Sequence, residues 1–215
     1  MSEDDNQRSL LSERLRPQCF CDLTLPPTTS VRLQHMVDKM RPMNMIFHGP
    51  PGTGKTSAAQ IFLRAWERFD RMEINGSLQT GVDFMREQVE GFARTPFGTA
   101  DIRLCFIDEA DHLSASAQAS LRVLIEKSEH GCRFIFAVNE LGKLSAPLKS
   151  RLQAVNFRIP AANRLAVQSQ LKERLSERLI ELGIKFDPVR LDDIVSLYFP
   201  DFRRIANALE FEFGA

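Results

Sequence analysis

The sequence predicts an α/β protein with a parallel β-sheet flanked by helices, followed by a small all-helical region. Three observations lead to this expectation. Short apolar runs alternate with segments of helical periodicity up to about residue 160. Most of these runs are continuously apolar, which is typical of strands buried on both faces of a parallel sheet. Beyond Pro160 only helical periodicity remains, so we expect an α/β domain at 1–160 and a helical lid domain at 161–215.

The individual elements follow from the same patterns. Because Pro17, Pro26 and Pro27 interrupt residues 12–30, that stretch is expected to be irregular. Strands are expected at 45–47, 72–74, 104–107, 133–138 and 154–157. Helices are expected near 30–40, 58–69, 82–92, 121–125, 165–180, 194–198 and 202–213.

Composition narrows the classes of function. The 215 residues carry 28 basic and 28 acidic side chains, so there is no bulk positive charge to attract nucleic acid, and any DNA contact has to come from a local basic cluster. No apolar stretch is long enough to cross a bilayer, and the acidic, polar N-terminus has no apolar signal region. We therefore expect no membrane partner and a cytoplasmic location, or a nuclear one in a eukaryote.

The four cysteines, Cys19, Cys21, Cys105 and Cys132, form no C-x-x-C pair. Cys105 and Cys132 lie within apolar runs. We expect reduced, buried thiols, and neither a zinc site nor a disulfide framework.

A complete phosphate-binding motif follows the first strand. The run Gly49-Pro50-Pro51-Gly52-Thr53-Gly54-Lys55-Thr56 fits G-x-x-x-x-G-K-S/T, the P-loop. Its glycines let backbone N–H groups turn inward around a phosphate, and the helix that follows points its positive end at the same anion. Lys55 is expected to reach the β- and γ-phosphates and Thr56 to ligate Mg²⁺, with Ser57 also in the nucleotide site. The alternative is a glycine-rich turn without a ligand.

A second motif, which is acidic, follows the third strand. Leu104-Cys105-Phe106-Ile107 delivers Asp108 and Glu109 at the end of an apolar strand, the Walker B arrangement. Asp108 is expected to hold Mg²⁺ and Glu109 to polarise the attacking water. His112 has no second histidine at ligand spacing, so we expect a surface residue. Together the two motifs predict a P-loop ATPase that binds and hydrolyses ATP with Mg²⁺.

The fourth strand ends in Asn139. An amide at this position could reach the γ-phosphate or the lytic water. On the residues alone, an ordinary turn asparagine remains open as the alternative.

The motifs together resemble the AAA+ ATPases and, within them, the small subunits of replication factor C, the clamp loader. The resemblance covers almost the whole chain. It rests on Glu13-Arg14-Leu15-Arg16-Pro17, the P-loop wording, Gly81-Val82-Asp83-Phe84-Met85-Arg86-Glu87, Phe92-Ala93-Arg94-Thr95, Asp108-Glu109-Ala110-Asp111, Ala117-Gln118-Ala119-Ser120-Leu121-Arg122, Ser150-Arg151-Leu152 and Asp201-Phe202-Arg203-Arg204.

The resemblance assigns further roles. It places Arg16 beside the adenine and makes Asn139 the first sensor of the γ-phosphate. Arg151 becomes an arginine finger offered to a neighbouring subunit's ATP, and Arg203 becomes the second sensor, from the lid. The implied partners are other AAA+ subunits in a ring, DNA and a sliding clamp, with Arg86, Arg94 and Arg122 as candidates for phosphate contacts; surface ion pairs are the alternative for these three.

Several positions depart from the family pattern. Leu152 and Leu25 replace a cysteine and a glycine, Pro200 replaces the glycine before Asp201, and residues 77–80 lack an arginine often offered to DNA. The family's helical collar domain would begin after Ala215. Its absence implies a truncated chain, an assembly held by other contacts, or a diverged member.

The leading hypothesis is a clamp-loader-type ATPase subunit. Two alternatives remain: an AAA+ remodeller of another client in a mobile element or a defence system, and a nucleotide-bound scaffold subunit that does not hydrolyse ATP. The presence of Lys55, Asp108, Glu109 and Arg151 argues against the scaffold.

Overall fold

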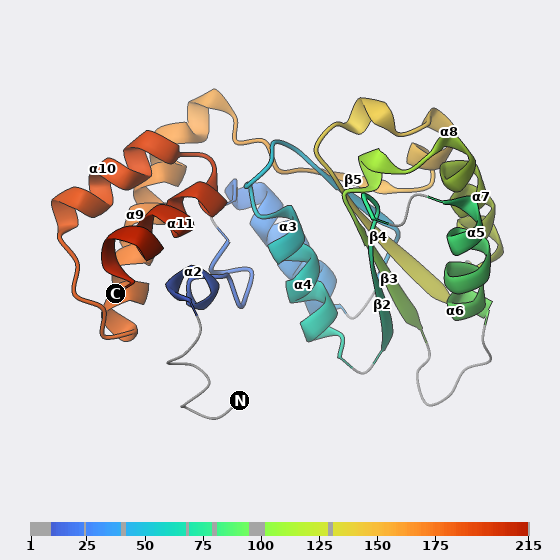
Figure 1. The fold of residues 1–215 in the computed structure, drawn as a ribbon, viewed down its shortest axis with the longest axis horizontal. Helices are drawn as coiled ribbons and strands as arrows, with labels where there is room; N and C mark the ends of the chain where they lie inside the picture. Colours follow the sequence, from blue (N-terminus) through green and yellow to red (C-terminus); the bar gives the residue numbers. More distant parts are fainter. Residues whose placement is uncertain are drawn as a thin grey trace.

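A computed structural model describes residues 10–23, 25–39, 42–67, 69–78, 81–94, 102–128 and 131–214. Within this part of the chain a parallel five-stranded sheet is flanked by helices, and a helical region follows it (Figure 1). The predicted fold class is confirmed. No helix of the described residues is long and apolar enough to cross a membrane.

The sheet has the strand order β2-β3-β4-β1-β5. The strand β1 lies between β4 and β5, with Met45 opposite both Ile135 and Gln153. Consequently the carboxyl ends of β1, β3 and β4 lie side by side, and the segments that follow them share one edge of the sheet. The strands are β1 (Met45–His48), β2 (Asp70–Asn75), β3 (Arg103–Asp108), β4 (Cys132–Val138) and β5 (Gln153–Asn156).

Two apolar layers cover the faces of the sheet. Along β3, Leu104 and Phe106 join the layer beneath α3 and α4, whereas Cys105 and Ile107 join the opposite layer. A central strand with helices on both sides alternates between two cores, which explains its continuously apolar sequence.

The helices α3 (Pro27–Asp38) and α4 (Lys55–Ala65) cover one face of the sheet (Figure 1). The opposite face carries α5 (Val82–Phe84), the π-helical turn η1 (Met85–Val89), α6 (Glu90–Arg94), α7 (Ala115–Lys127) and α8 (Ala146–Lys149). Short 3₁₀ turns are η2 (Ala110–His112), η3 (Leu141–Lys143) and η4 (Ala161–Asn163). The helical region consists of α9 (Arg164–Glu181), α10 (Pro188–Tyr198) and α11 (Phe202–Phe213).

The segment before the sheet is more ordered than the prolines suggest. A short helix, α2 (Leu11–Arg14), inserts Leu11 into the apolar core of α9, α10 and α11. Pro27 begins α3 instead of preventing it, because the first helical position needs no backbone N–H. The expectation of an irregular stretch over 12–30 was therefore wrong at both ends.

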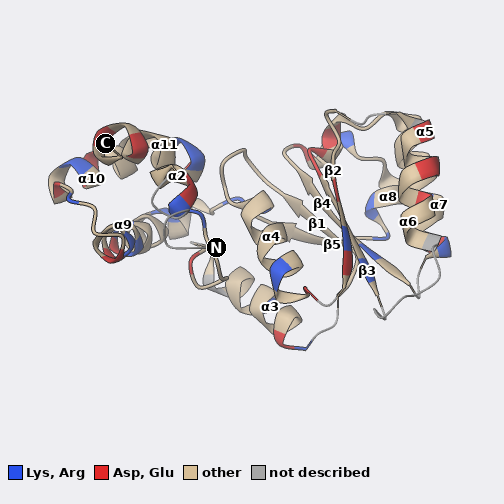
Figure 2. Cartoon of the chain, turned by 60° about the horizontal axis from the view of Figure 1, so that its bottom comes forward, with Lys and Arg blue, Asp and Glu red and all other residues tan. Residues whose placement is uncertain are grey.

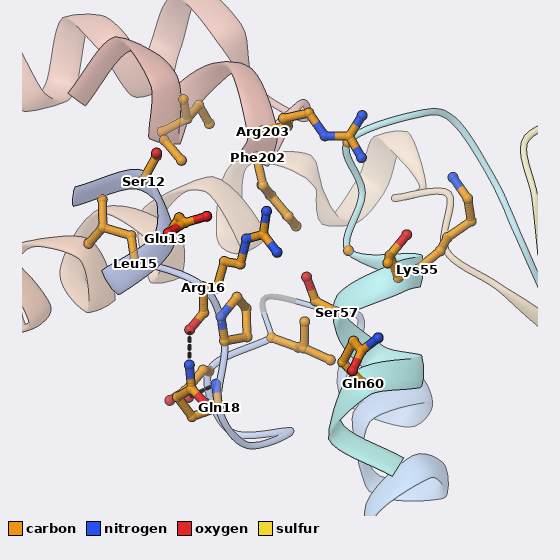
Figure 3. A pocket seen from close by; sticks show the side chains of 18 of the residues that line it. Ser12, Glu13, Leu15, Arg16, Gln18, Lys55, Ser57, Gln60, Phe202 and Arg203 are labelled. Carbon is orange, nitrogen blue, oxygen red and sulfur yellow. Dashed lines mark hydrogen bonds between the residues drawn. The ribbon is translucent and has the colours of Figure 1, made fainter. Parts of the chain in front are cut away.

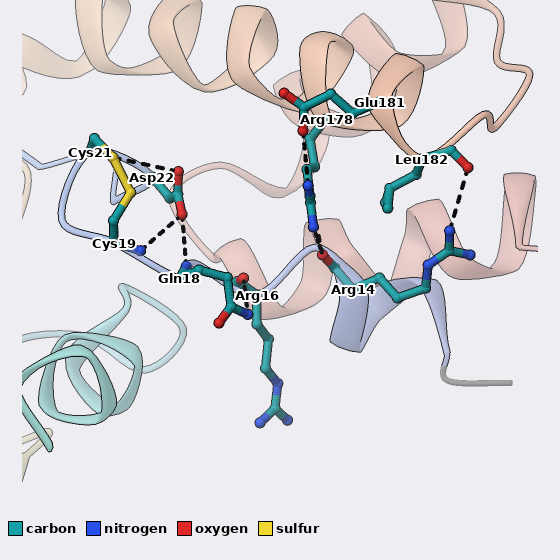
Figure 4. A network of polar contacts seen from close by, with 9 residues as sticks. All are labelled: Arg14, Arg16, Gln18, Cys19, Cys21, Asp22, Arg178, Glu181 and Leu182. Carbon is teal, nitrogen blue, oxygen red and sulfur yellow. Dashed lines mark hydrogen bonds and ion pairs between the residues drawn. A yellow bond between two sulfur atoms is a disulfide. The ribbon is translucent and has the colours of Figure 1, made fainter. Parts of the chain in front are cut away.

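The expectation for the cysteines was half wrong. Cys105 and Cys132 are free and buried, as expected, but Cys19 and Cys21 form a disulfide (Figure 4). Sequence spacing did not reveal that the chain turns sharply there: the Asp22 carboxylate accepts the N–H groups of Gln18 and Cys19 at 2.7 and 3.0 Å. This turn brings the two Cα atoms to 5.3 Å, within reach of a disulfide.

Candidate nucleotide site

The P-loop connects β1 to α4 in a shape that only glycines tolerate at two positions. Gly52 and Gly54 have φ angles of 75° and 89°, in the left-handed region. A Cβ atom on Gly52 would also lie 1.9 Å from an Asp201 carboxylate oxygen. Asp201 caps α11, and the Phe202 N–H donates to the Gly52 carbonyl at 2.9 Å, so the helical region contacts the P-loop directly.

Lys55 is buried, and its amine is held inside the loop. Nζ donates to the carbonyls of Gly49 and Pro50 at 2.9 and 2.8 Å and to Asn139 Oδ1 at 2.9 Å. Burial lowers the pKa of Lys55 to about 8, although the nearby Asp108 and Asp111 act in the opposite direction. The amine therefore occupies a site whose burial disfavours its charge, and an anion beside it would favour that charge.

The acidic motif lies against the start of α4. Thr56 Oγ1 donates to Asp108 Oδ2 at 2.8 Å, and the Glu109 N–H donates to Asp108 Oδ1 at 2.9 Å. Glu109 has a left-handed φ of 50°, an uncommon conformation outside glycine. The end of β3 and the start of α4 thus bring a carboxylate and a hydroxyl together as potential oxygen ligands for a metal ion. A second carboxylate, that of Glu109, follows Asp108 in the sequence.

These groups open into one cavity of about 570 Å³, a typical size for a small-molecule site (about 300–1,000 Å³). Among the residues expected in the nucleotide site, ten line it: Arg16, Pro51, Gly52, Gly54, Lys55, Thr56, Ser57, Asp108, Asn139 and Arg203. Glu109 lines it as well. Gly49 and Pro50 contribute to the site through their carbonyls, which accept hydrogen bonds from Lys55. Thr53 is buried, and its hydroxyl donates a hydrogen bond to the Pro50 carbonyl at 2.8 Å.

Two further walls complete the cavity, and among their residues only Arg16 was expected from the sequence. The N-terminal segment contributes Arg16, Gln18 and Leu23, and Arg16 extends toward α4 and α11 (Figure 3). The helix α9 contributes Arg174, which donates to the Leu23 carbonyl, and Arg178, which donates to the Arg14 carbonyl (Figure 4). Arg174 and Arg178 are four residues apart, as are Leu171 and Leu175, and this spacing puts each pair on one face of α9. This periodicity was the sequence signal from which the wall could have been found.

Arg151 does not lie in this cavity. It follows α8, near the β5 edge of the sheet, and it forms an ion pair with Glu126 at the end of α7. Within one described chain, the predicted finger and the predicted P-loop site are separate.

The proposed DNA contacts gain no support from the charge distribution. Figure 2 shows both signs of charge on the helices of either part of the chain. Arg122 lines a groove along α7 with Glu90, Ser120 and Lys127. The side chains of Arg86 and Arg94 lie outside the described residues.

The positions that depart from the family pattern have structural consequences of their own. Leu25 and Leu152 are buried in the two layers of the sheet, so each adds to the core and neither lines the cavity. His112 is exposed, as expected.

The donor set fits a magnesium nucleotide. Mg²⁺ prefers oxygen ligands and is commonly bound by one or two side chains together with substrate phosphates. The hydrogen-bonded pair Thr56–Asp108 supplies such oxygens, and the Lys55 amine supplies the positive charge for phosphates beside it. The start of α4 adds backbone N–H groups that lack partners within the helix.

The fold and the site together define a P-loop nucleotide-binding protein. The sequence model of the "ATPase family associated with various cellular activities (AAA)" matches residues 45–160, which include both motifs. The chain belongs to this family.

Known proteins resemble the chain beyond that region. The replication factor C small subunit of Archaeoglobus fulgidus is 33% identical over 209 residues, which cover 92% of this chain and 62% of the relative. The small subunit of Methanosarcina acetivorans is 31% identical, covering 98% and 62%. The chain therefore spans less than two thirds of these relatives.

Solved structures share the fold. The RuvB Holliday junction branch migration motor of Thermotoga maritima superposes with a TM-score of 0.70 at 19% identity, covering 92% of this chain and 64% of the motor. The Aeropyrum pernix ORC1 protein, solved in complex with DNA, gives a TM-score of 0.67 at 20% identity, covering 93% and 62%.

Proposed function

We propose that this chain is an ATP-hydrolysing AAA+ subunit of a clamp-loader-like complex that acts on DNA, in the cytoplasm or in a eukaryotic nucleus. The observation that carries the proposal is the convergence of Lys55, Asp108, Glu109 and Asn139 on one cavity beside the P-loop. The similarity to replication factor C small subunits supports the finer assignment.

Each residue has a definite task in this proposal. Thr56 and Asp108 hold Mg²⁺, which neutralises charge on the phosphates when bound. Lys55 binds the β- and γ-phosphates, and Glu109 takes the proton of the attacking water. Asn139, which already contacts Lys55, orients the water or the γ-phosphate.

Arg151 supplies the remaining positive charge to a neighbouring subunit. A P-loop surrounds the phosphates from one side, so a cation on the other side stabilises the charge that develops on the γ-phosphoryl oxygens. The position of Arg151 away from the cavity of its own chain supports a target in the cavity of the next subunit. In this proposal residues 1–160 are the nucleotide domain, whose helix α2 packs against the lid, and residues 161–215 are the lid, from which Arg203 lines the cavity.

Turnover in the presence of DNA tests the assignment to clamp loading. ATPase rates are measured for the assembled protein alone, with primer–template DNA, and with DNA plus a sliding clamp. Stimulation by both supports the proposal. Active ATP hydrolysis that neither component changes would favour remodelling of another client, and nucleotide binding without turnover under any condition would favour the scaffold hypothesis.

A further inference from the structure

The guanidinium of Arg151 is held by an acidic partner from a different element. Its Nε donates to Glu126 Oε1 at 2.8 Å, and Nη2 donates to the same oxygen. Glu126 lies in the last turn of α7, and Leu124 and Ile125 anchor that turn in the core. The partner of the flexible arginine is therefore attached to a fixed helix.

The other end of the guanidinium is also fixed. Nη1 donates to the Pro147 carbonyl at 2.5 Å and to Ser150 Oγ at 3.2 Å. These bonds occupy Nε, Nη1 and Nη2, and because a guanidinium has five N–H groups, four bonds leave one donor on Nη2. The Arg151 side chain is 29% exposed, so it lies at the surface, where a neighbouring subunit can approach it.

We propose that Glu126 is a positioning residue that orients Arg151 for the nucleotide of a neighbouring subunit. This inference rests on the proposed function, in which Arg151 acts in trans. Arginine has many rotamers, and an arginine finger that must be ordered each time a nucleotide is hydrolysed stabilises the transition state less, because ordering it costs conformational entropy. Glu126 restricts the rotamers in advance.

A role in folding alone does not explain the pair. Exposed ion pairs contribute little net stability, and the side chains of Arg151 and Glu126 are 29% and 48% exposed. Removing the carboxylate should therefore leave the fold intact and release the guanidinium.

The first test compares Glu126→Ala with Glu126→Gln in steady-state ATPase assays. Because small misplacements of a catalytic group cost up to about a hundredfold, Glu126→Ala should lower kcat by roughly ten- to a hundredfold with little change in KM. The amide oxygen of Glu126→Gln still accepts from Arg151, so this variant should retain most of the activity. In an Arg151→Ala background, Glu126→Ala should have no further effect.

Subunit mixing shows on which chain Glu126 acts. In mixtures of a Lys55→Ala chain, which donates the finger, and an Arg151→Ala chain, which donates the P-loop, Glu126→Ala is added to one chain at a time. Activity should fall when the change is on the finger-donating chain and stay constant when it is on the other. An equal fall in both arms would indicate a structural role and overturn the proposal.

The NMR signal of the Arg151 Nε–H gives a readout that does not depend on turnover. Glu126→Ala should shift this signal and accelerate its exchange with water, and Glu126→Gln should preserve it. An unchanged signal in Glu126→Ala, or failure of that variant to fold, would contradict the inference. If Arg151→Ala itself retains full ATPase activity, the proposed function fails; if Arg151→Ala is impaired and Glu126→Ala is not, only the role of Glu126 fails.

Discussion

The Lys55 amine donates to Asn139 Oδ1 across 2.9 Å, which joins the P-loop after β1 to the end of β4. The two residues are 84 positions apart in the sequence. The neighbouring positions of β1 and β4 in the sheet bring them together. The P-loop lysine and the candidate sensor are thus in direct contact.

Replacing Lys55 by alanine should weaken ATP binding by about tenfold to more than a hundredfold, since hydrogen bonds to charged groups contribute about 1.5–3 kcal/mol each. Titration of a fluorescent ATP analogue measures the affinity. Asn139→Ala is the matched comparison: it removes the other half of the contact and should bind ATP while hydrolysing it more slowly. Unchanged affinity in Lys55→Ala would exclude the phosphate-binding role.

Glu109→Gln should bind ATP normally and hydrolyse it about 10²–10⁴-fold more slowly, because the amide keeps the shape and cannot accept the proton. Single-turnover hydrolysis separates the two effects. Glu140→Gln, which changes an exposed carboxylate just after Asn139, serves as the control and should behave like the parent. Parental turnover in Glu109→Gln would remove Glu109 as the base.

Nucleotide binding should depend on pH through Lys55. Burial lowers the pKa of its amine to about 8 in the free protein, and phosphates beside it raise that pKa. The protein should therefore take up a proton on binding at and above pH 8, and affinity should fall as the pH rises further. Calorimetry in buffers of different ionisation enthalpy measures this uptake. Lys55→Arg, which stays protonated, should show none at this position, and equal uptake in both proteins would refute the assignment to Lys55.

The four cysteines should fall into two classes toward a thiol reagent. Burial raises the pKa of Cys105 well above its usual value and that of Cys132 to about 12, so both should be inert in the folded protein. Cys19 and Cys21 should react rapidly after mild reduction, and not before it. Thiol counting before and after reduction checks this, and rapid labelling of Cys105 in the folded protein would contradict it.

The sequence predicted the strands well because each of the central ones alternates between two apolar layers. The P-loop and the acidic motif could also be placed in advance, since both follow strands and parallel strands end at the same edge of a sheet. The wall formed by Arg174, and the part of the N-terminal segment around Leu23, could not. They depend on how α9 and α2 pack against residues far away in the sequence, which periodicity does not reveal.

The same limit explains why the ion pair between Arg151 and Glu126 could not be predicted from the sequence. Glu126 is an ordinary charged residue in the last turn of a helix, and 25 positions separate it from Arg151. The cysteine pair was missed for a local reason, because the turn depends on hydrogen bonds to the Asp22 carboxylate.

The central claim is that hydrolysis is completed between subunits, and mixing Arg151→Ala protein with Lys55→Ala protein tests it most directly. Each variant alone should be nearly inactive, since an arginine finger contributes about 10³–10⁵ in rate in related enzymes. In verified mixed assemblies, interfaces that pair an intact P-loop with an intact Arg151 should restore part of the ATPase activity. Mixed assemblies without any restored activity, or full activity in dilute monomer, would contradict the account.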